Sequence, residues 1–182
     1  MARRGRDVDG ILLLDKPRGI SSNAALQQIK RLFGAKKAGH TGNLDVQADG
    51  LLPICMGEAT KVCQFLLDSD KRYISQFTLG IRTTTGDCEG TTTSTGYIAD
   101  ISRTHVENEL SSFIGTSEQV PPMHSALKRN GQPLYKLAHQ GLEVERPSRP
   151  IHIYAIEIKS FLNPYVMVDL SLIHISEPTR RT

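Results

Sequence analysis

The chain has 182 residues, and 22 lysines and arginines against 19 aspartates and glutamates give it a formal net charge of +3. A chain of this length can bury roughly 70% of its unfolded surface, which is enough for one substantial core. The longest early apolar run is only Ile11 to Leu14, so we expect neither a signal peptide nor a membrane span. Composition therefore favours a cytoplasmic globular protein and excludes membrane and disulfide-framework classes.

Cysteine and histidine usage argues against a metal centre. Cys55, Cys63 and Cys88 contain no Cys-x-x-Cys pair and are expected to be reduced thiols. The six histidines are scattered without ligand spacing. The chain also has no glycine-rich phosphate loop of the P-loop or dinucleotide type. We therefore expect no metal and no nucleotide cofactor.

Hydrophobic periodicity predicts an α+β order of elements along the chain. The expected strands are 10–14, 51–55, 72–80, 151–161 and 165–170, with a strand pair within 83–95 and an extended segment over 119–128. The expected helices are 22–33, 58–67, 103–113 and 133–140. Ser21 or Ser22 is expected to cap the first helix. The residues expected to face inward are Leu26, Ile29, Leu32 and Phe33 on the first helix and Val62, Phe65 and Leu66 on the second.

One segment between these elements combines glycines with a single carboxylate. It reads Gly39-His40-Thr41-Gly42-Asn43-Leu44-Asp45, and Gly50 then leads into the apolar strand. Glycines permit tight turns or close backbone approach, so they can hold a reactive group rigidly at a cleft floor. A carboxylate such as that of Asp45 can serve as a nucleophile, a general base or an electrostatic stabiliser. Spacing alone leaves open that Asp45 only caps a turn.

Several motifs accompany this segment in the chain. They are Leu13-Leu14-Asp15-Lys16-Pro17, Gly50-Leu51-Leu52-Pro53-Ile54-Cys55-Met56-Gly57, Pro121-Pro122-Met123-His124-Ser125, Gly131-Gln132-Pro133-Leu134-Tyr135 and Gln140-Gly141-Leu142-Glu143-Val144. Taken in this order, they resemble the TruB family, the bacterial tRNA pseudouridine-55 synthases. The resemblance covers about residues 9 to 170. It implies an α+β pseudouridine synthase catalytic core, with a mixed, mostly antiparallel sheet flanked by helices.

The resemblance also implies an activity and its residues. The activity is isomerisation of uridine 55 in the T-arm loop of tRNA to pseudouridine, which needs no cofactor. Asp45 matches the catalytic aspartate, His40 the histidine that enters the RNA and helps to displace the base, and Tyr73 the tyrosine that stacks on the flipped base. The further candidate substrate-binding residues are Lys16, Thr41, Gly42 and Leu44. Two alternatives remain, a turn-capping His40 and a Tyr73 whose ring lies in the core.

Basic residues gather around these motifs. They are Arg3, Arg4 and Arg6, then Lys30, Arg31, Lys36 and Lys37, and finally Lys71 and Arg72. Such clusters suit a polyanion, because neutralising phosphates releases counterions and so supplies affinity. The expected partner is the tRNA T-arm stem-loop, with no membrane and no protein partner implied. Charge runs are also typical of a solvated face, which remains the alternative.

Two departures from the family pattern stand out. The family has Pro-Leu-Ala-Thr-Gly after the catalytic aspartate, whereas this chain has Val46-Gln47-Ala48-Asp49-Gly50, and we expect Asp49 to face solvent. The family continues into a Lys-Gly-Thr-Tyr-Ile-Arg segment whose arginine pairs with the aspartate, but this chain reads differently over residues 171–182. We interpret 171–182 as a non-native tail that forms no central strand, because it contains Pro178, and assign the arginine's role to neither Arg180 nor Arg181.

The domain expected from these patterns covers residues 1–170 and is an incomplete catalytic domain. Two other functions remain open. The first is a non-catalytic tRNA-binding or RNA-folding module, because the segment with the pairing arginine is missing. The second is a hydrolytic N-glycosidase that uses a similar carboxylate and releases uracil.

Overall fold

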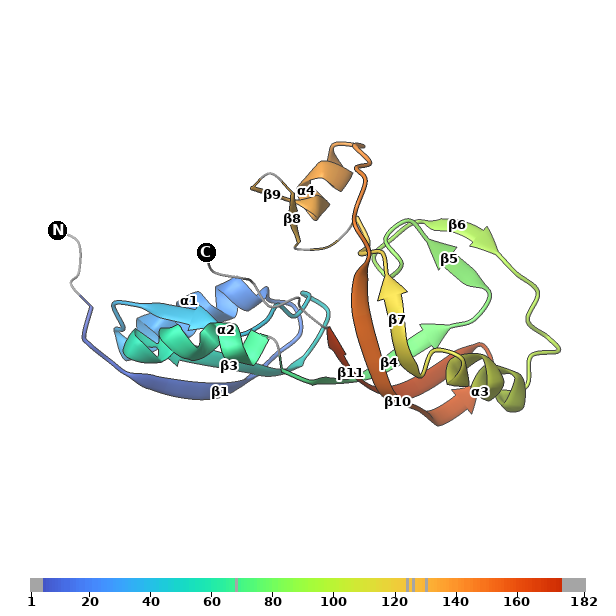
Figure 1. Ribbon diagram of the computed structural model, residues 1–182, viewed down its shortest axis with the longest axis horizontal. Coiled ribbons are helices and arrows are strands. Elements are labelled where there is room, and N and C mark those ends of the chain that lie inside the picture. The colour runs from blue at the N-terminus through green and yellow to red at the C-terminus, as the bar shows by residue number, and fades with distance from the viewer. Residues whose placement is uncertain (1–4, 68, 124, 126, 130, 175–182) are drawn as a thin grey trace. The chain divides into compact units, whose positions relative to one another are not determined.

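The structure is a computed structural model that describes residues 5–67, 69–123, 125, 127–129 and 131–174 (Figure 1). The chain divides into two compact units, Met1–Ser69 and Asp70–Thr182, where the sequence predicts one domain over 1–170. All strand pairs of the named sheets are antiparallel in the described residues, and helices accompany the sheets. The expected α+β class is therefore confirmed. Within the described ranges, every helix is too short or too polar to span a lipid bilayer.

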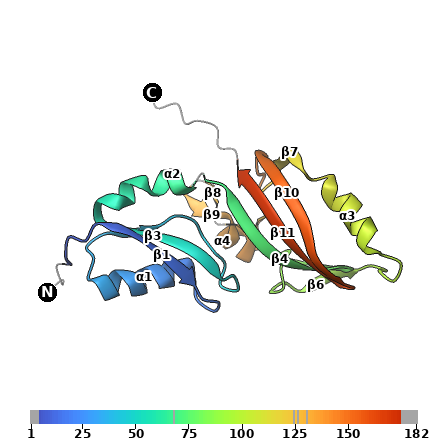
Figure 2. The same cartoon turned by 90° about the horizontal axis from the view of Figure 1, so that it is seen from below.

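The first unit is a three-stranded sheet with helices on its two faces (Figure 2). Its elements are β1 (Gly10–Lys16), α1 (Ser22–Phe33), β2 (Ala38–His40), β3 (Gly50–Met56), the 3₁₀ helix η1 (Gly57–Val62) and α2 (Cys63–Leu67). The strand order is β1-β3-β2, so the strand that follows the Asp45 loop is central. A Cβ on Gly39 of β2 would lie 3.6 Å from the Cys63 sulfur of α2, an ordinary van der Waals contact, so α2 begins beside β2 at this position.

Helix α1 has the boundaries that its end signals predict. Ser21 is its N-cap, and its side chain accepts a hydrogen bond of 3.1 Å from the Ala24 N–H. Gly34 ends the helix in the left-handed conformation at φ 61°. The apolar face of α1 packs on the sheet, and the buried cluster consists of Leu26, Ala35, Ile54 and Met56. This cluster is the core between α1 and the central strand β3.

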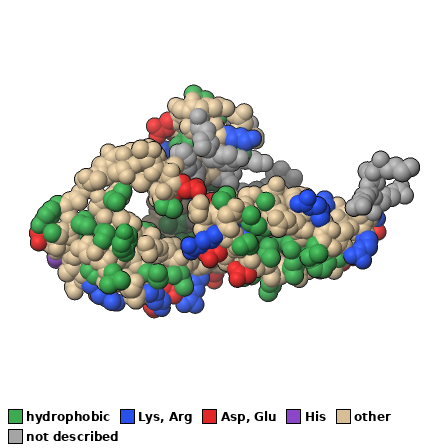
Figure 3. Space-filling view, turned by 180° about the vertical axis from the view of Figure 1, so that it is seen from behind, with side chains coloured by type: hydrophobic (Ala, Val, Ile, Leu, Met, Phe, Trp, Pro, Cys, Tyr) green, Lys and Arg blue, Asp and Glu red, His purple; other side chains and the backbone are tan. Residues whose placement is uncertain are grey.

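Three predicted inward-facing residues are exposed instead. Leu32 is 75% exposed, because it lies about 120° around the helix from Leu26. Val62 and Phe65 are 40% and 70% exposed. The predicted helix over 58–67 begins as η1, which has about three residues per turn, so the α-helical period of 3.6 gives the wrong face there. Apolar side chains are also visible at the surface of both units (Figure 3).

The cysteines are free thiols, as expected. Cys55 is fully buried on β3, and burial is the main reason that the pKa of its thiol rises to about 11. Because the thiolate is the reactive form, this cysteine is an inert core residue.

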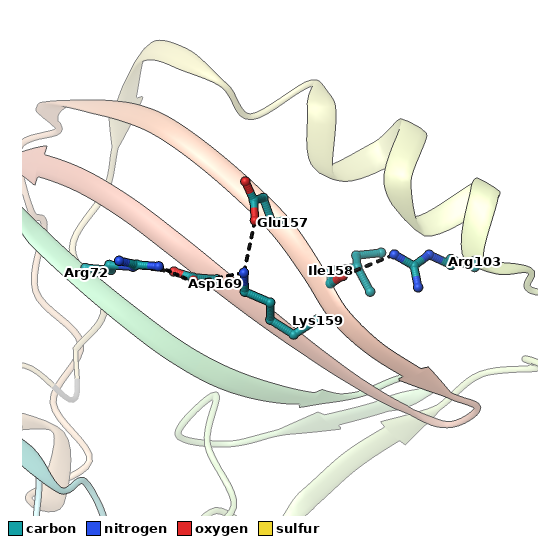
Figure 4. Close-up of polar contacts among 6 residues, drawn as sticks. All are labelled: Arg72, Arg103, Glu157, Ile158, Lys159 and Asp169. Carbon is teal, nitrogen blue, oxygen red and sulfur yellow. Dashed lines mark hydrogen bonds and ion pairs between the residues drawn. The ribbon is translucent and has the colours of Figure 1, made fainter.

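The second unit is built on a four-stranded antiparallel sheet in the order β4-β11-β10-β7. Its elements are β4 (Lys71–Thr78), β5 (Ile81–Thr83), β6 (Thr92–Thr95), α3 (Arg103–Ser111), β7 (Gly115–Gln119), β8 (Lys128–Arg129), β9 (Gln132–Pro133), α4 (Leu134–His139), β10 (Arg149–Leu162) and β11 (Tyr165–His174). β5 and β6 form the predicted strand pair, and β10 and β11 meet at Asn163-Pro164 as predicted. Helix α3 packs beside β10, where Arg103 donates to the Ile158 carbonyl at 3.1 Å (Figure 4).

Strand β11 differs from its prediction at its end. It was expected to stop at Leu170, with a tail after it that forms no central strand. Instead Ser171 to His174 continue β11 in the centre of the sheet, and Leu172 pairs with Lys71 on one side and Ile153 on the other. Side chains alternate between the two faces of a strand, and here the apolar side chain of Leu172 is buried. Pro178 comes four residues after the end of β11 in the sequence and so does not interrupt the strand. Residues 175–182, including Arg180 and Arg181, lie outside the described residues.

An ion-pair cluster joins three strands of this sheet (Figure 4). Arg72 on β4 binds the Asp169 carboxylate on β11 through two hydrogen bonds of 2.9 and 2.8 Å. Lys159 on β10 lies 3.4 Å from the same carboxylate and donates to Glu157 at 3.1 Å. The Arg72 guanidinium is the main reason that the pKa of Asp169 falls from 3.8 to about 2.

We expect this cluster to make the stability of the second unit depend on acidity. The folded state keeps Asp169 charged at pH values where the unfolded chain protonates it, so its contribution is complete above pH 3.8 and is lost as pH falls toward 2. Thermal unfolding of the native chain and of Asp169→Asn at successive pH values measures this. The advantage of the native chain should shrink across that window, and a constant difference would contradict the assignment.

Candidate active site

The predicted catalytic aspartate lies in a loop that connects β2 to β3 in the first unit. Thr41 begins the loop, and its N–H donates to the Pro53 carbonyl at 3.1 Å. Gly42 and Gly50 have φ angles of 129° and 124°, which L side chains rarely adopt, so these two glycines are required by the path of the loop. Within it, the Ala48 N–H donates to the Asp45 carbonyl at 3.1 Å. The loop is therefore a defined turn that connects the neighbouring antiparallel strands β2 and β3.

Both neighbours of Asp45 are held by residues 19–22, where the connection from β1 runs into the first residue of α1. The Ser22 hydroxyl accepts from the Leu44 N–H at 2.8 Å and donates to the Leu44 carbonyl at 3.0 Å. The Gly19 N–H donates to the Val46 carbonyl at 2.8 Å. The backbone on either side of Asp45 is thus hydrogen-bonded to one segment.

The Asp45 side chain itself is exposed to solvent. No hydrogen bond or ion pair joins its carboxylate to another group in the part of the chain that the structure describes. The turn hydrogen bond of Asp45 is made by its backbone carbonyl, and so the carboxylate is left accessible to a substrate.

Asp49 faces solvent in this loop, as expected. Its carboxylate lies 3.3 Å from the Arg18 guanidinium, and the two side chains are 56% and 71% exposed. Pairing with Arg18 compensates the second negative charge near Asp45. The departure from the family pattern at this position is therefore accommodated by an exposed ion pair.

Lys16 differs from its prediction as a substrate-binding residue. Its side chain is fully buried, and its ammonium donates to the carbonyls of Pro17 and Ile20 at 2.9 Å each. These carbonyls belong to the same connecting segment that holds the Asp45 loop. The structure therefore gives Lys16 a part in ordering that segment in place of an exposed charge for RNA.

His40 is the last residue of β2, where it pairs with Ile54. Its side chain is half-buried, and its Nδ1 atom is buried without a hydrogen-bond partner among the described residues. A buried ring nitrogen without a partner costs free energy, so this atom is an unpaired polar group next to the start of the Asp45 loop. The alternative that His40 caps a turn is therefore excluded for its Nδ1 atom.

Tyr73 lies on β4 in the second unit, 37% exposed and paired with Leu170. Because side chains alternate along a strand, Tyr73 and Phe77 share one face, while Arg72 points to the other face, toward Asp169. Arg72 was expected to serve RNA binding beside Tyr73, and its bidentate bond to Asp169 now gives it a structural partner. Tyr73 remains the predicted stacking residue on its own face.

Several of the other basic residues also contact groups of the chain itself. Lys36 pairs with Asp7 at 2.7 Å, and Arg6 donates to the Phe33 carbonyl at 2.7 Å. Arg31 donates to the Gln27 carbonyl at 3.1 Å. Part of the basic surface expected to bind RNA therefore consists of exposed side chains that already contact other groups of the chain.

Two grooves lie beside α3 in the second unit. The larger has a volume of about 610 Å³ and is mainly apolar, with Phe77, Val106 and Ile156 among its lining. The smaller, about 340 Å³, is lined by Arg103 and Glu157 among others. Neither lining includes a predicted site residue, so the candidate chemistry rests on the exposed Asp45 loop.

Comparison with known proteins decides the family. The profile of the "TruB family pseudouridylate synthase (N terminal domain)" matches residues 30–176, which include the Asp45 loop and most of the second unit. The chain belongs to the TruB family. The expected resemblance is confirmed, and the matched domain crosses the boundary between the two compact units.

Individual TruB relatives agree with this assignment. The chain is 55% identical over 160 residues to tRNA pseudouridine synthase B of Nitrosococcus oceani, covering 88% of this chain and 52% of that protein. It is 54% identical over 181 residues to the protein of the same name from Psychromonas ingrahamii, covering 98% of this chain and 57% of the relative. The chain spans about half the length of these curated relatives.

Solved structures share the fold of this TruB chain. A chain from a structure titled "Crystal Structure of a Cbf5-Nop10-Gar1 Complex" superposes with a TM-score of 0.67 at 24% identity, covering 96% of this chain and 41% of that one. A second, from "Structure of H/ACA RNP bound to a substrate RNA containing 2'-deoxyuridine", has a TM-score of 0.61 at 22% identity and covers 92% and 39%. At these identities the likeness establishes the fold.

Sequence reasoning missed the residues that hold the Asp45 loop. The sequence pattern indicates Ser22 only as a possible helix cap and gives no signal for Arg18 or Gly19. The one usable signal was the pair Ser21-Ser22 before the helix, because a single serine suffices for a cap. The hydroxyl of the second serine is therefore available for a hydrogen bond outside the helix cap.

Proposed function

We propose that this chain is the catalytic part of a tRNA pseudouridine synthase that isomerises uridine 55 in the T-arm loop. Asp45 carries the proposal, because it is an exposed carboxylate between two backbone positions held by the same segment. Membership of the TruB family and the names of its relatives support the reaction class. The cytoplasmic location expected from the sequence follows from the tRNA substrate and is part of the same proposal.

The proposed reaction rearranges one nucleotide. The bond from uracil N1 to ribose C1′ breaks, the base turns, and C5 joins C1′; C5 loses its hydrogen as a proton, and N1 gains one. The carboxylate of Asp45 acts on the ribose, either by attack at C1′ or by removal of a ribose proton. No redox partner or activated donor is needed, because the substrate and product are isomers.

Base extraction is the other step that the protein must support. Removing a base from its stack costs a few kcal/mol, which a pocket offsets by stacking and hydrogen bonding. We assign the displacement of the base to His40, whose Nδ1 has no partner within the described residues, and the stacking to Tyr73. Thr41, Gly42 and Leu44 shape the loop that would contact the nucleotide.

Tyr73→Leu tests the stacking role. Loss of base stacking on an aromatic ring costs about 1–3 kcal/mol, so product formation at low RNA concentration should fall by a factor of about 5 to about 150. Tyr97→Leu is a matched control, since Tyr97 is a 79% exposed tyrosine of the same unit. Equal rates for the two variants would remove Tyr73 from the site.

The function itself is tested with an unmodified T-arm stem-loop. The purified chain is mixed with this RNA, and retained RNA, pseudouridine and free uracil are measured separately. The proposal predicts binding together with pseudouridine. Binding without product, unchanged by Asp45→Asn, would favour the RNA-binding module, and release of uracil would favour the N-glycosidase.

A further inference from the structure

We propose that Ser22 is a positioning residue that fixes the position of the Asp45 carboxylate. Its hydroxyl forms two hydrogen bonds to the backbone of Leu44, and we call this pair of bonds the Ser22 clamp. This inference rests on the proposed function, since it assigns a role within that reaction. Ser22 does not touch the reacting groups and acts through the loop.

The contact has two properties that suit a clamp. The Ser22 side chain is fully buried, so water does not compete for its hydroxyl. One oxygen accepts from the Leu44 N–H at 2.8 Å and donates to the Leu44 carbonyl at 3.0 Å. Two hydrogen bonds from one atom to both polar groups of a residue restrict its movement more than either bond alone.

The rest of helix α1 explains why Ser22 is free to do this. Ser21 already caps the helix through the Ala24 N–H, so the Ser22 hydroxyl is not needed for capping. Ser22 is the first residue of α1, and α1 is packed on the sheet through Leu26. The clamp therefore ties the loop to a helix that the core holds in place.

A second restraint acts on the other side of Asp45. The Gly19 N–H holds the Val46 carbonyl at 2.8 Å, and the buried Lys16 ammonium orders the carbonyls of Pro17 and Ile20 around Gly19. With Ser22 removed, only the Val46 side remains attached to this segment. The loop would then turn about Val46 and move the carboxylate away from its reacting position.

Ser22→Ala is expected to lower kcat about tenfold to a hundredfold, because a displacement of about 1 Å costs that much in a catalytic geometry. KM for the T-arm stem-loop should change less than kcat, since Tyr73 and the basic side chains lie outside the loop that moves. Ser21→Ala is the matched control: it removes the neighbouring hydroxyl and weakens the helix cap, but it does not touch Leu44. A role of Ser22 in stability alone would give the two variants the same kcat once both are folded.

Amide hydrogen exchange of the whole chain gives a readout that needs no activity. Exchange at Leu44 should become faster in Ser22→Ala and stay unchanged in Ser21→Ala. If the native chain makes no pseudouridine, the proposed function fails, and this measurement still decides whether the clamp exists. Unchanged exchange at Leu44, or a kcat of Ser22→Ala equal to that of Ser21→Ala, would overturn the proposal.

Discussion

Replacing Asp45 by asparagine is expected to lower pseudouridine formation by at least about a thousandfold, the scale on which loss of a directly acting acid or base appears. Asparagine has nearly the same shape but carries no charge and is a poor nucleophile and base, so the loop and the RNA contacts should persist. Tritium release from T-arm RNA labelled at C5 measures the reaction, because C5 loses its hydrogen when it joins C1′. Binding of the same RNA should be retained.

Asp49→Asn is the control for this variant. It makes the same chemical change in the same loop, at an exposed carboxylate that pairs with Arg18. An exposed ion pair is worth at most about 1 kcal/mol, so the rate should change by less than about fivefold. Similar rates for the two variants would mean that Asp45 has no chemical role.

Ile54→Ala is expected to have the largest effect on stability, about 2–5 kcal/mol off the free energy of unfolding of the first unit. Ile54 is fully buried on the central strand β3 and belongs to the cluster with Leu26 and Met56. Truncation leaves a cavity beneath the sheet that supports the Asp45 loop. Denaturant unfolding followed by circular dichroism measures the loss.

Two further variants separate burial from strand position. Ile54→Val removes one methylene group and should cost about 0.5–1.5 kcal/mol. Leu13→Ala changes a 67% exposed residue of the neighbouring strand β1 and should stay within about 0.5 kcal/mol. A loss for Ile54→Ala no greater than that for Leu13→Ala would show that this cluster is not the core of the unit.

Elements with strong local signals could be predicted from the sequence. The cap at Ser21, the apolar positions Leu26 and Phe33 and the glycine at residue 34 define α1, and all of them lie within the helix or next to it. Strands β2 and β7 could not be predicted, because β2 has three residues and β7 is Gly115–Gln119, which contains no apolar alternation. Their pairing is decided by the neighbouring strands.

The candidate site shows the same division. The identities of Asp45, His40 and Tyr73 come from the family resemblance, because glycine spacing around one acid is a weak signal. The partners of these segments come from contacts between distant residues. Ser22 reaches Leu44 across 22 positions, and Arg72 reaches Asp169 across 97, so no local pattern marks either pair.

The most direct test of the central claim is a crystal structure of the chain carrying Asp45→Asn with an unmodified T-arm stem-loop bound. The account predicts that the target uridine is turned out of the RNA and that its ribose C1′ lies within about 3.5 Å of the side chain at position 45, the distance of a near-attack geometry. A bound RNA whose nearest ribose lies well beyond that distance, with the loop in its present form, would contradict the account.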